Sequence, residues 1–179
     1  MFGNYALFGV LKAVLANPPQ KLSVRETAKK SGVSASTAKN SLDFLKKLGV
    51  IKLRVVGKTY QYEAVLENAL ARQWKILFSL MELNDARLVE KILGKAKNVS
   101  SILLYGSLAK GIGDDKSDVD LLVISNSKHL HLDIDLKREL NIMFLTPFEW
   151  GVKAKSDKVF YEQVIFDSIV LHGVRPVVL

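Results

Sequence analysis

Two aspartates separated by a single residue, Asp118 and Asp120, are the side chains in this sequence best suited to metal chemistry. They open the apolar segment DVDLLVI, which predicts a β-strand. Successive side chains of a strand point to opposite faces, so both carboxylates project to one side, about 7 Å apart, and Val119 projects to the other. Two carboxylates at the open end of a strand suit a hard divalent cation, Mg²⁺ or Mn²⁺.

The residues ahead of this strand are suited to holding a phosphate. The apolar run 99–105 predicts a preceding strand, which ends at Gly106 and Ser107. Gly106 allows another group to approach the backbone closely. Ser107 falls where the start of a short helix would present free N–H groups to an anion. The stretch from Leu104 to Ile124 therefore combines a phosphate cradle with a metal-binding pair.

The motif GSLAKGIGDDKSDVDLLV resembles the signature of the nucleotidyltransferase superfamily of the DNA polymerase β type, and within it the minimal nucleotidyltransferases. That signature is Gly-Ser, a short helix, a ten-residue gap (here 108–117) and Asp-x-Asp on the next strand. The ending FYEQVIFDSIVLHG is also similar to the close of these proteins, so the resemblance reaches nearly to the end of the chain. The alternative, an amphipathic strand behind a polar turn, does not explain why both aspartates share one face.

The resemblance implies roles for particular residues. Asp118 and Asp120 would be the catalytic residues and would hold the metal ion, while Gly106 and Ser107 would bind the triphosphate of a nucleoside triphosphate. Lys110 would add positive charge beside the phosphates, the alternative being an ordinary solvated lysine.

The sequence departs from the family at one position, Asn141. The resemblance implies a third carboxylate on the next core strand, and the matching residue in KRELNIMFL is this asparagine. An amide oxygen can bind Mg²⁺, but it carries no negative charge and cannot accept a proton from an attacking hydroxyl. We therefore expect a nucleotide site without its catalytic base. Asp133, Asp135 and Glu139 are the alternative carboxylates, but nothing in their spacing favours them. If the strand 140–145 lies beside the strand 118–124, Asn141 should point at the two aspartates.

Positive charge is concentrated at the start of the chain. Residues 1–65 carry eleven Lys and Arg against three Asp and Glu, a formal +8, whereas the remainder carries fifteen of each sign. This asymmetry is typical of a module that binds a polyanion, joined to a neutral module.

The first 65 residues resemble the winged helix-turn-helix domains of arsenic- and multidrug-resistance regulators. The pattern predicts helices over 5–16, from Ser23 to Gly32 with a Ser23–Glu26 capping box, and from a Ser34 or Ser36 cap to about residue 48. Leu42, Leu45 and Leu48 should face inward on the third helix. A hairpin over 50–65 with Gly57-Lys58 at its turn would be the wing.

That resemblance implies binding to double-stranded DNA through the third helix and the wing. The expected groove-facing residues are Ser36, Thr37, Lys39 and Asn40, and the expected phosphate contacts are Lys52, Arg54 and Lys58. The alternative is a helical domain with solvated basic faces that binds protein.

We expect an α+β protein: a winged helix-turn-helix domain (1–65), linker helices (66–94) and a small nucleotidyltransferase-fold domain (95–179) with a mixed sheet and helices. The linker stripe containing Trp74 and Phe78 would seal the two domains or pair two chains as a homodimer. Residues 129–140 fit both a strand and a helix, and we expect a helix. Their histidines, His129 and His131, do not have metal-ligand spacing with the nearby aspartates.

Composition excludes several classes of protein. The chain is 49% hydrophobic and 25% charged, as in ordinary globular proteins, and it has no cysteine for disulfides or thiolate metal sites. No apolar run reaches the roughly 18 residues of a membrane span, and no signal segment opens the chain. We expect a cytoplasmic protein with no membrane partner.

Three functions follow from these patterns. The first is a DNA-binding, transcription-regulator-like protein whose nucleotidyltransferase domain binds a Mg²⁺-nucleoside triphosphate with weak or lost transfer activity. The second is an active enzyme that transfers a nucleoside monophosphate to a protein or nucleic-acid hydroxyl. The third is an antitoxin that pairs with a small helical toxin-like protein.

Overall fold

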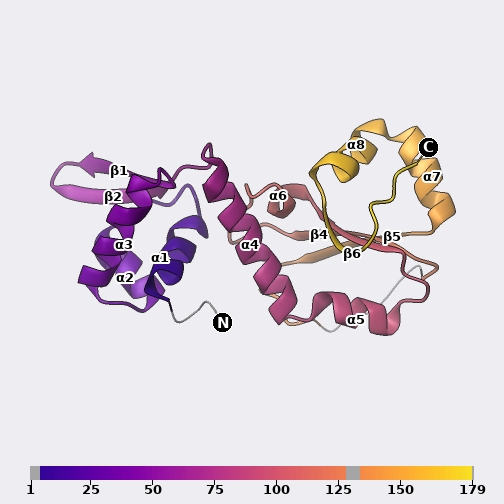
Figure 1. Cartoon of the computed structure of the whole chain (residues 1–179), viewed down its shortest axis with the longest axis horizontal. Coiled ribbons are helices and arrows are strands. Elements are labelled where there is room, and N and C mark those ends of the chain that lie inside the picture. The colour runs from indigo at the N-terminus through magenta and orange to yellow at the C-terminus, as the bar shows by residue number, and fades with distance from the viewer. Residues whose placement is uncertain (1–4, 128–133, 179) are drawn as a thin grey trace. The chain divides into compact units, whose positions relative to one another are not determined.

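The computed structural model describes residues 5–127 and 134–178. The chain forms two compact units, Met1–Phe78 and Ser79–Leu179 (Figure 1). Their boundary falls inside helix α4 (Ala69–Asp85), within the stretch expected to contain the linker helices. None of the helices in the described ranges is long and apolar enough to cross a lipid bilayer.

The N-terminal unit begins with three helices and continues into an antiparallel hairpin. The helices are α1 (Ala6–Leu15), α2 (Val24–Ser31) and α3 (Ala35–Lys47), and the hairpin strands are β1 (Ile51–Val56) and β2 (Thr59–Ala64). Leu22, between α1 and α2, forms a β-bridge with Tyr62 and so ties the helices to the hairpin.

Local signals define the ends of these elements as predicted. Ser23 and Glu26 form the reciprocal capping box of α2, which ends at Gly32 with a φ of 67°. Of the two candidate caps for α3, the structure uses Ser34, whose side chain accepts a hydrogen bond from the Thr37 N–H. The hairpin turns at Gly57 and Lys58.

The core of this unit corrects one expectation about α3. Leu42 and Leu45 are buried, but Leu48 is 43% exposed. Leu48 follows the last residue of α3 and is succeeded by Gly49, whose φ of 70° turns the chain toward β1. The helical periodicity that predicted an inward Leu48 therefore ends before that residue.

The C-terminal unit is a mixed sheet with helices on both faces. Its elements are α5 (Leu88–Lys95), β3 (Ser101–Tyr105), α6 (Gly106–Ala109), β4 (Val119–Ile124), β5 (Leu140–Leu145), α7 (Pro147–Ser156), α8 (Lys158–Asp167) and β6 (Ile169–Gly173). The strand order is β5-β4-β3-β6, with β4 and β5 parallel and the other pairs antiparallel. The expected α+β class with a mixed sheet is confirmed.

Both faces of the two central strands are buried. Val119, Leu121 and Val123 of β4 pack with α5 and the end of α4 on one face. Leu122 and Ile124 pack with α7 and α8 on the other, as Figure 1 shows for the helices above and below the sheet. Asp118 and Asp120 alternate along the chain with Val119, Leu121 and Val123, so their side chains belong to the face of the sheet that α7 and α8 cover.

The expectation of a helix over 129–140 is wrong for its described part. Residues 134–139 are not helical, and 140 begins β5. Ile134 and Leu136 instead pack alternately against the core, while Asp135 and Lys137 are exposed. Packing of Ile134 and Leu136 against the core residues of β3 and β4 thus replaces the helix that the competing periodicity predicted. His129, His131 and Asp133 lie outside the described residues.

The different burial of the leucines of α3 gives a stability prediction. Leu42→Ala should destabilise the N-terminal unit by about 2–5 kcal/mol, because it removes a fully buried side chain and leaves a cavity. Leu48→Ala is the matched control and should change stability by about 0.5 kcal/mol or less. Urea unfolding of the full chain, followed by Trp74 fluorescence in a Trp150→Phe background, measures both, and equal costs would contradict the packing described here.

Candidate active site

The turn from β3 into α6 brings the backbone of Gly106 against Asp120. Gly106 has a φ of 77°, a conformation that L-residues rarely adopt, and a Cβ at this position would overlap Asp120 Oδ2. The positive φ favours glycine here, and a larger residue would also displace the Asp120 carboxylate. Gly106 and the second aspartate of the motif, distant by fourteen residues in sequence, are therefore in contact in the fold.

Asp118, Asp120 and Asn141 lie together at the edge where β4 and β5 begin. Asp120 is the register partner of Asn141 across the parallel pair. The Asn141 Nδ2 lies 3.3 Å from Asp118 Oδ2 and 3.4 Å from Asp120 Oδ1. The structure thus places Asn141 beside both carboxylates, as its strand position predicts. At these lengths the two hydrogen bonds are weak.

This donor set is compatible with a magnesium or manganese ion. The Asn141 amide lies between two carboxylates, and rotation of the amide by 180° would turn Oδ1 toward the same point. Two carboxylates and an amide oxygen are ligands that Mg²⁺ accepts. Within residues 5–127 and 134–178, no group of three or more His, Cys, Asp or Glu side chains is arranged to hold a metal. Asp135 and Glu139 therefore do not complete a carboxylate trio.

Tyr105 of β3 continues the line of register partners formed by Asn141 of β5 and Asp120 of β4. The sequence motif did not point to it. It is the register partner of Asp120 on β3. Its ring packs edge-on against Phe160 of α8, with centroids 5.4 Å apart. Burial, together with the negative charge of Asp120, raises the pKa of the Tyr105 hydroxyl. Tyr105 is therefore a neutral group at physiological pH, beside the charged pair.

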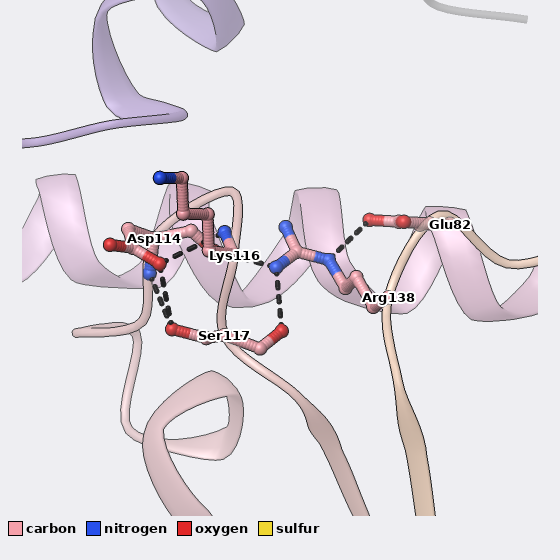
Figure 2. A network of polar contacts seen from close by, with 5 residues as sticks. All are labelled: Glu82, Asp114, Lys116, Ser117 and Arg138. Atoms are coloured by element: carbon pink, nitrogen blue, oxygen red, sulfur yellow. Dashed lines mark hydrogen bonds and ion pairs between the residues drawn. The ribbon is translucent and has the colours of Figure 1, made fainter.

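The loop before Asp118 is closed by its own hydrogen bonds (Figure 2). The Asp114 carboxylate accepts from the Lys116 N–H at 2.9 Å and from the Ser117 hydroxyl at 3.0 Å. These donors lower the pKa of Asp114. Arg138 then binds the loop from outside, donating to the carbonyls of Asp114 and Ser117. Sequence reasoning missed Arg138, because its partners are more than twenty residues away.

Lys110 is engaged in an ion pair. Its Nζ lies 2.8 Å from Asp167 Oδ2, at the end of α8, and both side chains are partly exposed. Lys110 must leave or share this partner before it can approach a phosphate. The Ser107 carbonyl accepts hydrogen bonds from the N–H groups of Ile112 and Gly113, which shapes the loop that follows.

The predicted groove-facing residues lie in the first two turns of α3. Ser36, Lys39 and Asn40 are exposed, whereas Thr37 is half-buried and its hydroxyl contacts the Ser34 hydroxyl at 2.9 Å. Lys39 pairs with Asp43 one turn later at 2.6 Å. Thr37 thus contributes to the helix cap, and the other three form the accessible set.

Of the three predicted wing contacts, Lys52, Arg54 and Lys58, the first two are paired with an acidic side chain. Lys52 Nζ and Arg54 Nε both bind Glu63 Oε1, at 3.0 and 2.7 Å. Burial by itself would raise the pKa of Glu63, but the hydrogen bonds from Lys52 and Arg54 outweigh it and lower that pKa. Lys58, at the turn, has no anionic partner among the described residues. The hairpin therefore presents less free positive charge than its sequence suggests.

Comparison with known proteins assigns the C-terminal unit. Residues 87–174 match the family described as "Polymerase beta, Nucleotidyltransferase", a match that runs from α5 to the end of the sheet. The chain therefore contains a nucleotidyltransferase-type domain.

Comparison with solved structures gave a neighbour for about half of the chain. It is Sso10a-2, a DNA-binding protein from Sulfolobus solfataricus, at 19% identity and a TM-score of 0.37, covering 49% of this chain and 92% of that one. No curated protein matches the chain.

The contact between Gly106 and Asp120 gives a second prediction. Gly106→Ala should destabilise the C-terminal unit by about 1 kcal/mol or more, from the positive φ, and should displace Asp120. Gly94→Ala is the control, because a Cβ there meets nothing within 4 Å and the site lies in helix α5. It should be neutral or stabilising by about 0.5–1 kcal/mol. Thermal unfolding of the full chain measures both, and two neutral substitutions would contradict the crowding at position 106.

Proposed function

We propose that this chain is a DNA-binding, transcription-regulator-like protein whose C-terminal domain binds a Mg²⁺- or Mn²⁺-nucleoside triphosphate and transfers the nucleotidyl group weakly or not at all. The observation that carries this proposal is the position of Asn141. It stands in register with Asp120 and contacts both aspartates, where the family resemblance implies a third carboxylate.

The chemistry of the site follows from its side chains. A bound divalent cation would neutralise phosphate charge and orient the triphosphate for in-line attack. Asp118 and Asp120 would hold it, and Asn141 would contribute at most a neutral oxygen. The close backbone at Gly106 and Ser107 would receive the triphosphate, with Lys110 assisting once it separates from Asp167. Position 141 carries an amide, which is not a base and therefore does not accept the proton of the attacking hydroxyl.

The N-terminal unit supports the DNA-binding part of the proposal. Its order of helices and hairpin, and the bridge from Leu22 to Tyr62, suit a winged helix-turn-helix. The formal charge of residues 1–65 is +8. Ser36, Lys39 and Asn40 would enter the major groove, while Lys52, Arg54 and Lys58 would contact the DNA backbone.

An exposed apolar stripe on α4 supports a homodimer. Leu70 and Leu77 are 43% and 37% exposed and stand seven residues apart, with the half-buried Trp74 between them. This is the spacing of a helix that pairs with a second helix. A dimer would present two recognition helices to two half-sites, roughly 34 Å apart.

The second candidate function is an active transferase that modifies a hydroxyl of a protein or nucleic acid, including an antitoxin that acts on a small helical toxin-like partner. An exposed apolar surface of the C-terminal unit favours a protein partner. Phe148 and Val152 of α7, with Val159 and Phe166 of α8, are between 52% and 79% exposed. Large apolar side chains exposed on two consecutive helices are candidate contacts for a protein partner.

The DNA-binding proposal predicts a specific salt dependence. The full chain should bind duplex DNA with an affinity that falls steeply as salt rises. Lys58→Ala should lower the slope of log affinity against log salt by about 1 and weaken binding equally on all sequences. Asn40→Ala should instead change sequence preference. Lys155→Ala, on the charge-balanced C-terminal unit, should change neither, and salt-independent or absent binding by the full chain would refute the proposal.

The enzymatic part is tested at position 141. Wild-type nucleotidyl transfer, measured with labelled nucleoside triphosphates and Mg²⁺ or Mn²⁺ in cell lysate, should be feeble or absent. Asn141→Asp should raise it by ~10²-fold or more, because a positioned base contributes about that factor. Asn141→Ser, which restores no charge, is the control. A wild-type rate that Asn141→Asp does not improve would favour the second candidate function.

A further inference from the structure

Arg138 connects two parts of the C-terminal unit that are distant in sequence (Figure 2). Its Nη1 donates to the carbonyls of Asp114 at 2.6 Å and Ser117 at 2.9 Å. Its Nε donates to Glu82 Oε2, on α4, at 3.1 Å. The Arg138 side chain is only 13% exposed. Its three hydrogen bonds are therefore made largely out of water, and all use a charged donor, which makes them stronger than neutral ones.

The carbonyl of Ser117 directly precedes Asp118, so Arg138 acts on the first residue of the carboxylate pair. The contacts continue along both segments. The Val119 N–H donates to the Glu139 carbonyl at 2.8 Å, and the Asn141 amide reaches both aspartates. Arg138 thus stands at the outer end of a continuous line of contacts that ends at the candidate cation site.

Geometry, rather than charge, is what Arg138 supplies. Glu82 compensates its positive charge, and the planar guanidinium directs separate N–H groups at the two carbonyls and at the carboxylate. Asp118 precedes β4, whose first residue is Val119. The backbone on its N-terminal side therefore lacks the ladder of strand hydrogen bonds, and the Arg138 contacts hold it instead.

We propose that Arg138 is a positioning residue that fixes Asp118 for cation binding, with Glu82 of α4 orienting its guanidinium. The inference rests on the proposed function, because it takes Asp118 and Asp120 as the cation ligands. It adds two residues, Arg138 and Glu82, that neither the sequence motif nor the carboxylates themselves identify.

Binding of Mn²⁺ alone to the full chain, measured calorimetrically well below the unfolding temperature, tests this role. Arg138→Met should weaken Mn²⁺ binding by about 10- to 100-fold, the usual effect of losing a residue that orients a metal ligand. Arg138→Lys should bind Mn²⁺ nearly as weakly, although it keeps the charge beside Glu82, because one ammonium cannot serve both carbonyls and the carboxylate. Glu82→Gln, which keeps an acceptor, should weaken binding less.

The matched control is Arg87→Met, which removes an exposed arginine paired with Glu90 on the same unit. It should leave Mn²⁺ affinity unchanged. A merely structural Arg138 would make affinity follow the melting temperature. Positioning instead predicts that Arg138→Lys loses affinity while retaining a near-wild-type melting temperature.

Amide hydrogen exchange without metal provides a second readout. Arg138→Met should speed exchange at residues 115–119 and leave the buried strand β3 protected. Unchanged exchange in the loop, or unchanged Mn²⁺ affinity in a folded Arg138→Met, would overturn the positioning role. The double substitution Asp118→Asn, Asp120→Asn separates the two proposals. If it binds Mn²⁺ as well as the wild type, or if the wild type does not bind, the proposed metal site fails and this inference fails with it.

Discussion

The parallel register of β4 on β5 is the constraint on which the candidate site depends. Both faces of β4 are packed against helices, so a shift of one residue would exchange its two sets of buried side chains and turn Asp120 toward the face that α5 covers, which is strongly disfavoured. With that register in place, Asp120 must stand opposite Asn141. The arrangement of carboxylates and amide is thus a consequence of core packing, and it needs no binding partner to form.

Several lysines and arginines that are predicted to bind DNA or nucleotide are already paired with acidic side chains of the same chain. Glu63 binds both Lys52 and Arg54, Asp43 binds Lys39, and Asp167 binds Lys110. Lys52, Arg54 and Lys110 are predicted contacts to phosphate, and Lys39 is a predicted groove-facing residue. Partly exposed pairs of this kind are individually weak, so a polyanion can compete for the basic partner. They also hold long side chains in defined positions, which lowers the entropy lost on binding.

Much of the local structure could be predicted because its causes are local. The capping box at Ser23, the turn at Gly57 and the strand that follows Asp118 and carries Asp120 each depend on residues within a few positions of one another. Residues 134–139 and Leu48 were wrongly predicted, for two different reasons. For residues 134–139 the helical pattern was real in the sequence, but contacts of Ile134 and Leu136 with β3 and β4 decided the outcome. For Leu48 the cause is local, because the turn at Gly49 ends the helical periodicity one residue later.

The sequence by itself determined the nucleotidyltransferase-type motif, the face shared by its two aspartates, the asparagine at position 141 and the confinement of net charge to the first 65 residues. Only the tertiary structure decided which side chains meet these residues. The contacts of Gly106 with Asp120, of Tyr105 with Phe160 and of Arg138 with Glu82 join elements separated by fourteen to fifty-six residues. Such pairings are set by the packing of the whole sheet and its helices, and no periodicity or spacing in the chain encodes them.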